Sequence, residues 1–169
     1  HCISSAASDV YKRQVENKII RIMPNLLIRE NNGLIPFVKN YDGDYLNFID
    51  GGLSFLGKTE EFDEELFALI TAISGSGPAW FYELSNQLVK SATKLGMNEN
   101  DATNLIKGLI KALPNLINED DTFDELVNKV KSPKGTTEAG LNSLIVDNFD
   151  NIIFNAIRQA TNRSVSYTH

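Results

Sequence analysis

The residue types that could do chemistry concentrate in the loop Lys131–Gly140. Its sequence, Lys-Ser-Pro-Lys-Gly-Thr-Thr-Glu-Ala-Gly, combines three hydroxyl side chains with a proline and a glycine that discourage helix continuation. A hydroxyl of Thr136 or Thr137 suits the N-cap of a helix running to about Val146. Such a helix start offers unpaired backbone N–H groups and a positive dipole end. We therefore predict a binding site for a small carboxylate at this helix start. Most loops of this composition, however, are only capped loops.

A second glycine-rich stretch, Ser74–Trp80, contains Gly-Ser-Gly-Pro. It follows a helical pattern instead of a strand, and Trp80 stands where a dinucleotide fingerprint has its third glycine. With Pro78 at a first helical position, it is typical of a tight junction between helices, with backbone donors exposed where Ala79 begins its helix.

The composition excludes several kinds of site. Cys2 is the one cysteine, and the two histidines are the terminal residues, so we expect no disulfide, no metal site and no histidine-dependent catalysis. The net charge of −6 argues against non-specific nucleic-acid binding. No apolar run approaches the roughly 20 residues that span a bilayer, and no signal peptide opens the chain. A reducing cytoplasm fits best.

Residues 15–60 have the pattern of the end of an α/β domain and are too few to form one. Lys18–Met23 predicts a buried strand that stops at Pro24-Asn25, and Leu34–Val38 predicts a second strand that Pro36 would confine to a sheet edge. Helical spacing follows at Tyr45, Ile49, Leu53 and Leu56, and Gly57 suits its C-terminal cap.

Residues 61–164 are predicted to form an all-helical domain whose helices run from Glu64 onward, with Asn98 as one N-cap and Thr122–Glu125 as a capping box. The apolar stripes are wide, and large side chains also lie off them. Those off-stripe residues are Trp80, Tyr82, Val89 and Leu116. The surplus indicates a second helical surface from a partner chain; a thicker core within one chain is the alternative.

Both ends look foreign to this pattern. Residues 1–14 show neither helical nor strand periodicity, and residues 165–169 stop without a cap signal. We interpret both as non-native tails, with short disordered tails as the alternative. The native part would then run from about Val15 to Ser164 and lack its front.

Several ordered segments resemble the pyrroline-5-carboxylate reductase family. They are Arg21–Asn25, Leu69–Trp80, Lys94–Met97, Val130–Leu141 and Ala160–Ser164, and the resemblance spans about residues 18–164. It implies a Rossmann domain that binds NADPH or NADH, followed by a helical domain that interlocks with its twin as a homodimer or higher oligomer, with the active site near the dimer interface. The chain is then mainly α: a helical dimerisation and substrate-binding domain preceded by a remnant of a Rossmann-type α/β domain.

The resemblance also implies roles for individual residues. Thr137 is similar to the threonine whose hydroxyl hydrogen-bonds the ring nitrogen of 1-pyrroline-5-carboxylate, which the family reduces to L-proline. Ser132 and the backbone of Gly135 and Thr136 resemble the cradle for the substrate carboxylate. Met23, Pro24 and Asn25 would lie near the nicotinamide, a looser assignment.

The sequence departs from the family at three positions. Lys134 stands where glycine is usual, Lys131 where a small residue is usual, and Leu26 where threonine is usual. Lys134 would either add positive charge for a carboxylate or point into solvent. A reductase-like paralogue with another imine or keto substrate, and a helical interaction module without catalysis, are the alternatives. No Gly-x-Gly-x-x-Gly follows a strand, so we expect this polypeptide alone to bind no NAD(P)H and to be inactive.

Overall fold

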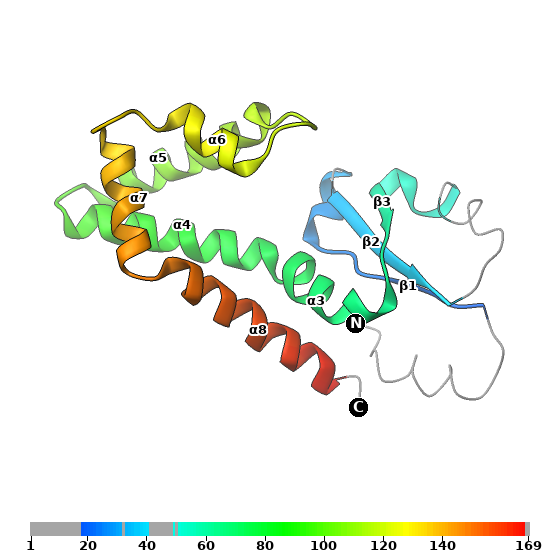
Figure 1. Cartoon of the computed structure of the whole chain (residues 1–169). Helices are drawn as coiled ribbons and strands as arrows, with labels where there is room; N and C mark the ends of the chain where they lie inside the picture. The colour runs from blue at the N-terminus through cyan, green and yellow to red at the C-terminus, as the bar shows by residue number, and fades with distance from the viewer. Residues whose placement is uncertain (1–17, 32, 41–48, 50, 168–169) are drawn as a thin grey trace. The chain divides into compact units, whose positions relative to one another are not determined.

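The computed structural model describes residues 18–31, 33–40, 49 and 51–167 (Figure 1). They form two compact units. One contains the described residues up to Trp80 together with those from Phe154 onward, and the other is Phe81–Ile153. The predicted domain boundary lies between residues 60 and 61. The contacts divide the chain at other positions, and the predicted boundary stays a prediction.

A three-stranded sheet begins the first unit. The strands are β1 (Ile20–Ile22), β2 (Gly33–Lys39) and β3 (Gly57–Glu61), in the order β1-β2-β3. β2 pairs antiparallel with β1 and parallel with β3. Both predicted strands are present, but β1 is half-buried and not buried as expected. The prediction that Leu34–Val38 would lie at an edge is also wrong, because β2 is central.

The position of Pro36 explains why a central strand tolerates it. Ile22 pairs with Phe37, so the next pair in register is Met23 with Pro36, just beyond the end of β1. The Met23 N–H donates to the Pro36 carbonyl at 2.9 Å. Proline has no N–H to donate to a neighbouring strand. At Pro36 the missing hydrogen bond lies just beyond the end of β1, where the pairing between β1 and β2 already ends. β2 stays bonded to β3 on its other side.

The core of this unit lies on the sheet. Ile35 and Val38 are almost fully buried, and Phe37 packs with Ile49 and Leu53. Of the predicted helix around Tyr45–Leu56, residues 41–48 and 50 lie outside the described part. Residues 49, 51 and 52 are helical, and a 3-10 turn at Ser54–Leu56 ends at Gly57 as predicted.

Strand β3 was not predicted, because its sequence Gly-Lys-Thr-Glu-Glu has no apolar alternation. It starts at Gly57, whose φ of 153° and ψ of −175° belong to a region that is essentially restricted to glycine. A Cβ at this position would overlap the carbonyl oxygen of Gly33 on β2. The glycine thus permits the close approach that starts the parallel pairing.

From Glu64 onward the chain is helical, as predicted. The helices are a 3-10 turn at Glu64–Leu66, α3 (Phe67–Ile70), a π-helix at Thr71–Gly75, α4 (Gly77–Lys94), α5 (Glu99–Ala112) with a 3-10 extension at Leu113–Leu116, α6 (Phe123–Val130), α7 (Thr136–Val146) and α8 (Phe149–Tyr167). None of the helices in the described residues is long and apolar enough to cross a membrane.

Local signals set most of these boundaries. The Asn98 side chain accepts the N–H groups of Asn100 and Asp101, and both halves of the Thr122–Glu125 capping box are present. The predicted junction between helices is present, and Ser76 alone separates the π-helix from α4. The expectation of exposed donors where Ala79 begins its helix is wrong, because α4 begins at Gly77 and the Ala79 N–H donates to the Ser76 carbonyl at 3.0 Å. Helix α8 continues to Tyr167, past the predicted end at Ser164, while the foreign origin of residues 165–169 stays a prediction.

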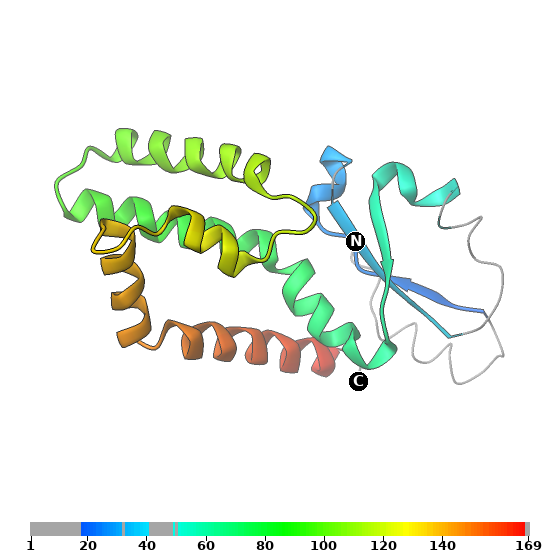
Figure 2. The same ribbon diagram turned by 45° about the horizontal axis from the view of Figure 1, so that its top comes forward.

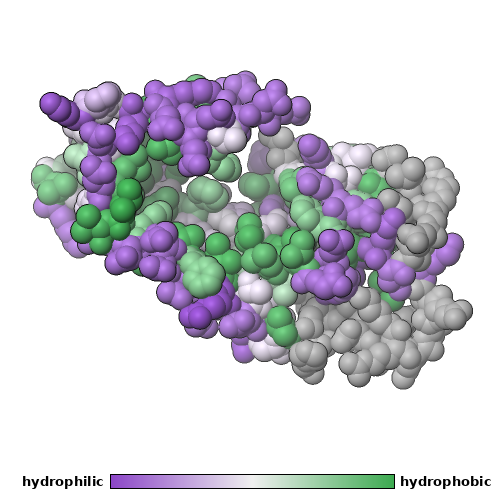
Figure 3. All heavy atoms as spheres, viewed as in Figure 1, coloured by the Kyte–Doolittle hydropathy of each residue, from purple (hydrophilic) through white to green (hydrophobic). Residues whose placement is uncertain are grey.

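The unit Phe81–Ile153 has almost no interior of its own. Ala102 is its one buried residue, and its helices contact one another only sparsely. Tyr82 and Leu116 are 61% and 63% exposed, so the alternative of a thicker core within one chain is wrong for them. Hydrophobic side chains gather at the surface of this unit below a hydrophilic rim (Figure 3). The helices of this unit therefore present exposed apolar faces.

Candidate functional site

The predicted carboxylate loop forms the corner at which α7 turns away from the direction of α6 (Figures 1 and 2). The Gly135 N–H donates to the Ser132 carbonyl at 3.0 Å, which closes a four-residue turn. Pro133 is its second residue, and Lys134, the third, has a φ of 58°. This is the pattern of a type II turn, whose third residue is normally glycine. A non-glycine residue there costs about 1–2 kcal/mol.

The predicted N-cap of α7 is wrong. Neither Thr136 nor Thr137 caps the helix: Gly135 is the N-cap, without a side-chain bond, and the two threonines are the first helical residues. A Cβ at position 135 would overlap Ser132 Oγ and press on the Ser132 carbonyl oxygen, so the turn leaves little room for a side chain at this N-cap. A side-chain acceptor comes instead from Glu138, whose Oε2 accepts the Lys134 N–H at 2.7 Å.

The first turn of α7 leaves backbone donors open. Its first helical bond runs from the Ala139 N–H to the Gly135 carbonyl at 3.2 Å. In the described part of the chain, no acceptor is found for the N–H groups of Thr136, Thr137 and Glu138. Thr137 is half-buried and Thr136 is exposed. A helix start with open amides beside a threonine hydroxyl is chemically able to bind a small carboxylate.

The Met23-Pro24-Asn25 motif is held to the Ser74–Gly75 stretch. The Asn25 Nδ2 donates to the carbonyl and the hydroxyl of Ser74, at 3.1 and 3.2 Å. Its Oδ1 accepts the Leu27 N–H at 2.9 Å and so caps a 3-10 helix at Leu26–Glu30. The Met23 methyl group lies where a Cβ on Gly75 would be. Both polar atoms of Asn25 are thus engaged within the chain, a link that the sequence did not reveal.

A second contact in this unit also escaped the sequence analysis. The Arg21 guanidinium forms an ion pair with Glu64 and lies 3.9 Å from the centre of the Phe67 ring. Strand β1 is thereby joined to the start of α3. Met23–Asn25 belong to the first unit and Ser132–Thr137 to the second, so each group stands as a separate candidate site.

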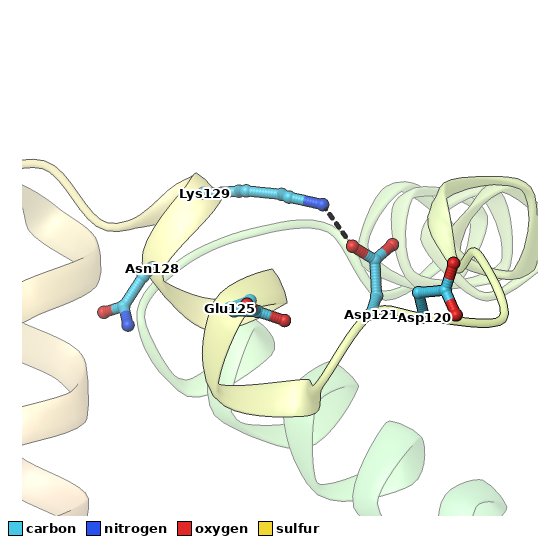
Figure 4. Close-up of a pocket in the computed structure, with 5 residues that line it drawn as sticks. All are labelled: Asp120, Asp121, Glu125, Asn128 and Lys129. Carbon is cyan, nitrogen blue, oxygen red and sulfur yellow. Dashed lines mark hydrogen bonds and ion pairs between the residues drawn. The ribbon is translucent and has the colours of Figure 1, made fainter.

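A shallow depression of about 510 Å³ lies beside α6 (Figure 4). It is lined by Asp120, Asp121, Glu125, Asn128 and Lys129. Lys129 Nζ donates to Asp121 Oδ1 at 2.6 Å. This bond and the backbone and side-chain N–H groups of Asn118 lower the pKa of Asp121 to about 2. The Asp121 carboxylate already has its hydrogen-bond partners within the chain. The depression is therefore the surface of a capped loop.

We predict that Lys129→Met raises the pKa of Asp121 towards its ordinary value of 3.8, measured by NMR titration of its carboxyl carbon. Because the folded-state pKa is depressed, the ion pair contributes above pH 3.8 and is lost as the pH falls to about 2. Lys107→Met, on the exposed face of α5, should leave the Asp121 titration unchanged. An unchanged titration in Lys129→Met contradicts the assignment.

Comparisons with known proteins agree with this fold. Residues 64–167 match the family model described as pyrroline-5-carboxylate reductase dimerisation. The pyrroline-5-carboxylate reductase of Staphylococcus haemolyticus is 34% identical over 155 residues, which cover 90% of this chain and 57% of the relative. That of Staphylococcus epidermidis is 32% identical over 173 residues, or 99% of this chain and 64% of the relative.

Solved structures show the same similarity. The pyrroline carboxylate reductase of Plasmodium falciparum, with NADP bound, superposes with a TM-score of 0.78 at 27% identity over 91% of this chain and 60% of that one. The reductase of Coxiella burnetii, at 24% identity and a TM-score of 0.83, shares the fold. The chain spans between 57% and 64% of the length of these four relatives. Since the family model covers more than half of its residues, the chain belongs to the pyrroline-5-carboxylate reductase family.

Proposed function

We propose that this chain is part of an enzyme that reduces 1-pyrroline-5-carboxylate to L-proline with hydride from NADPH or NADH. The chain contributes the substrate loop and the helical surface for a homodimer or higher oligomer. The observation that carries the proposal is the start of α7, where open amides lie beside the half-buried Thr137. The cytoplasm is the expected location.

The proposal gives each part of the substrate a partner in this chain. The substrate carboxylate is anionic, and the amides at the start of α7 with Ser132 supply donors and a positive dipole end. The Thr137 hydroxyl hydrogen-bonds the ring nitrogen and so orients the C=N bond. Reduction adds a hydride to the carbon and a proton to the nitrogen; the nicotinamide supplies the hydride when it is bound.

The residues of this chain do not make a complete cofactor site. The sequence has no Gly-x-Gly-x-x-Gly after a strand, and the polar atoms of Asn25 are already bonded within the chain. Met23 and Pro24 remain proposed neighbours of the nicotinamide, and Asn25 then acts by holding them.

We predict that the 169-residue polypeptide alone does not bind NAD(P)H. Its missing fingerprint removes the backbone donors that hold the pyrophosphate. Quenching of cofactor fluorescence is the measurement, and micromolar binding contradicts the prediction.

The function is tested on a protein in which the upstream α/β part has been restored. It should oxidise NAD(P)H when 1-pyrroline-5-carboxylate is supplied, and L-proline should accumulate. A protein that binds the cofactor but turns over other cyclic imines or keto acids instead would support the paralogue that Leu26, Lys131 and Lys134 leave open. A protein that dimerises and reduces none of these compounds would be a non-catalytic helical module. Such a module would account for the exposed apolar faces without any catalytic role.

A further inference from the structure

Two of the residues that depart from the family pattern converge on one carboxylate. The Glu138 Oε2 accepts the backbone N–H of Lys134 at 2.7 Å, and its Oε1 lies 3.7 Å from Lys131 Nζ. Glu138 is the third residue of α7 and is itself half-buried. The two lysines are therefore connected through Glu138 before any substrate is considered.

The bond to Lys134 bears directly on the conformation of the turn. Type I and type II turns differ chiefly in the orientation of their central peptide group. Here that group joins Pro133 to Lys134, and its N–H is the one that Glu138 accepts. A lysine as third residue favours type I, since type II requires the positive φ that Lys134 adopts. An acceptor on the N–H therefore selects type II, the form that a glycine would adopt without help.

The turn sets the position of the open amides. Ser132 and Gly135 close it, and Thr136 and Thr137 follow at once. A flip of the central peptide would keep the Ser132–Gly135 bond, which both turn types contain, but would point the Pro133 carbonyl oxygen toward the start of α7 in place of the Lys134 N–H. The carboxylate that prevents this lies near the same helix start, where an unpaired negative charge would disfavour an anionic substrate. Lys131 offsets that charge.

We infer that Glu138 is a positioning residue of the substrate loop, and that it holds the Pro133–Lys134 peptide in the type II orientation while Lys131 neutralises its charge. Lys131 and Lys134 are then part of the support of the loop and do not mark a different substrate. The expected effect of Glu138 on catalysis rests on the proposed function. The expected effect of Glu138 on the conformation of the turn does not depend on that function.

The catalytic test uses the protein with its upstream part restored. Glu138→Ala should raise the KM for 1-pyrroline-5-carboxylate about tenfold, the loss expected for a hydrogen bond to a charged acceptor. The kcat should stay within about twofold, because the reacting atoms are not touched. Glu138→Gln keeps an acceptor oxygen and should recover most of the KM. In the Glu138→Ala background, Lys134→Gly should also recover it, because glycine adopts a positive φ freely.

A structural readout separates this inference from the function. In the 169-residue chain, hydrogen exchange of the Lys134 amide should be about tenfold faster in Glu138→Ala than in the unsubstituted chain, because its acceptor is gone. Glu99→Ala is the matched control, since Glu99 begins α5 without a bond to a neighbouring loop. It should change neither the exchange rate of Lys134 nor the KM.

The outcomes are distinguishable. Unchanged exchange at Lys134 in Glu138→Ala overturns the inference, whatever the enzyme does. A KM that rises equally in Glu138→Ala with and without Lys134→Gly overturns the turn argument and assigns Glu138 another role. A restored protein without reductase activity, but with faster exchange in Glu138→Ala, supports the positioning of the turn and defeats only the proposed function.

Discussion

In the protein with its upstream part restored, Thr137→Ala should lower kcat/KM for 1-pyrroline-5-carboxylate by about 100-fold or more, the range expected for loss of a group that hydrogen-bonds the reacting nitrogen. Thr137 is the second residue of α7, it does not cap the helix, and in the described residues its hydroxyl has no bond within the chain. Its removal should therefore cost activity and little stability. Steady-state kinetics and a thermal melt measure the two effects.

Two further variants sharpen this prediction. Thr137→Ser keeps the hydroxyl and should retain most of the activity, which a purely steric role for the methyl group would not allow. Thr93→Ala is a matched control, because the Thr93 hydroxyl donates to the Val89 carbonyl on an exposed part of α4. It should have wild-type kinetics. If Thr137→Ala turned over the substrate normally, Thr137 would have no catalytic role.

Gly57→Ala should lower the free energy of unfolding by about 3 kcal/mol, which places it among the more damaging single substitutions. The φ of 153° is strained for any L-residue, and the added Cβ would meet the backbone of Gly33, which cannot rotate away. The start of the β2–β3 pairing would have to open. Urea unfolding followed by circular dichroism is the measurement.

Gly51→Ala is the control for Gly57→Ala. A Cβ at Gly51 would meet no atom within 4 Å, and Gly51 has no positive φ. We expect this variant to be as stable as the unsubstituted chain or slightly more stable, since alanine lowers the entropy of the unfolded state. Equal losses at the two positions would show that backbone strain at Gly57 is not the cause.

Sequence patterns predicted the elements whose signals are local. The helical periods, the Asn98 cap and the Thr122–Glu125 capping box depend on residues three or four positions apart, and each is present. The open start of α7 was predicted for the same reason, although the wrong residue was expected to cap it. Gly135 is the cap, and the close approach of Ser132, which leaves little room for a side chain there, is visible only in the turn geometry.

The features that sequence reasoning missed depend on residues distant in the chain. Pro36 was placed at an edge because its register against Met23 was unknown. Strand β3 has no apolar alternation of its own, and its pairing with β2 starts at Gly57, whose missing Cβ permits the close approach to Gly33. The bonds from Asn25 to Ser74 and from Arg21 to Glu64 span 49 and 43 positions. Only the positive φ of Lys134 had a local signal, since the resemblance led us to expect glycine at that position.

The single buried alanine of the Phe81–Ile153 unit has a consequence for every measurement on this protein. In the proposed homo-oligomer this stretch gains its stabilising burial from another copy of the chain, so its helices and its self-association would form in one coupled equilibrium. Diluting the sample then weakens the helices themselves. A melting temperature or a urea midpoint has meaning only together with the molar concentration at which it was recorded.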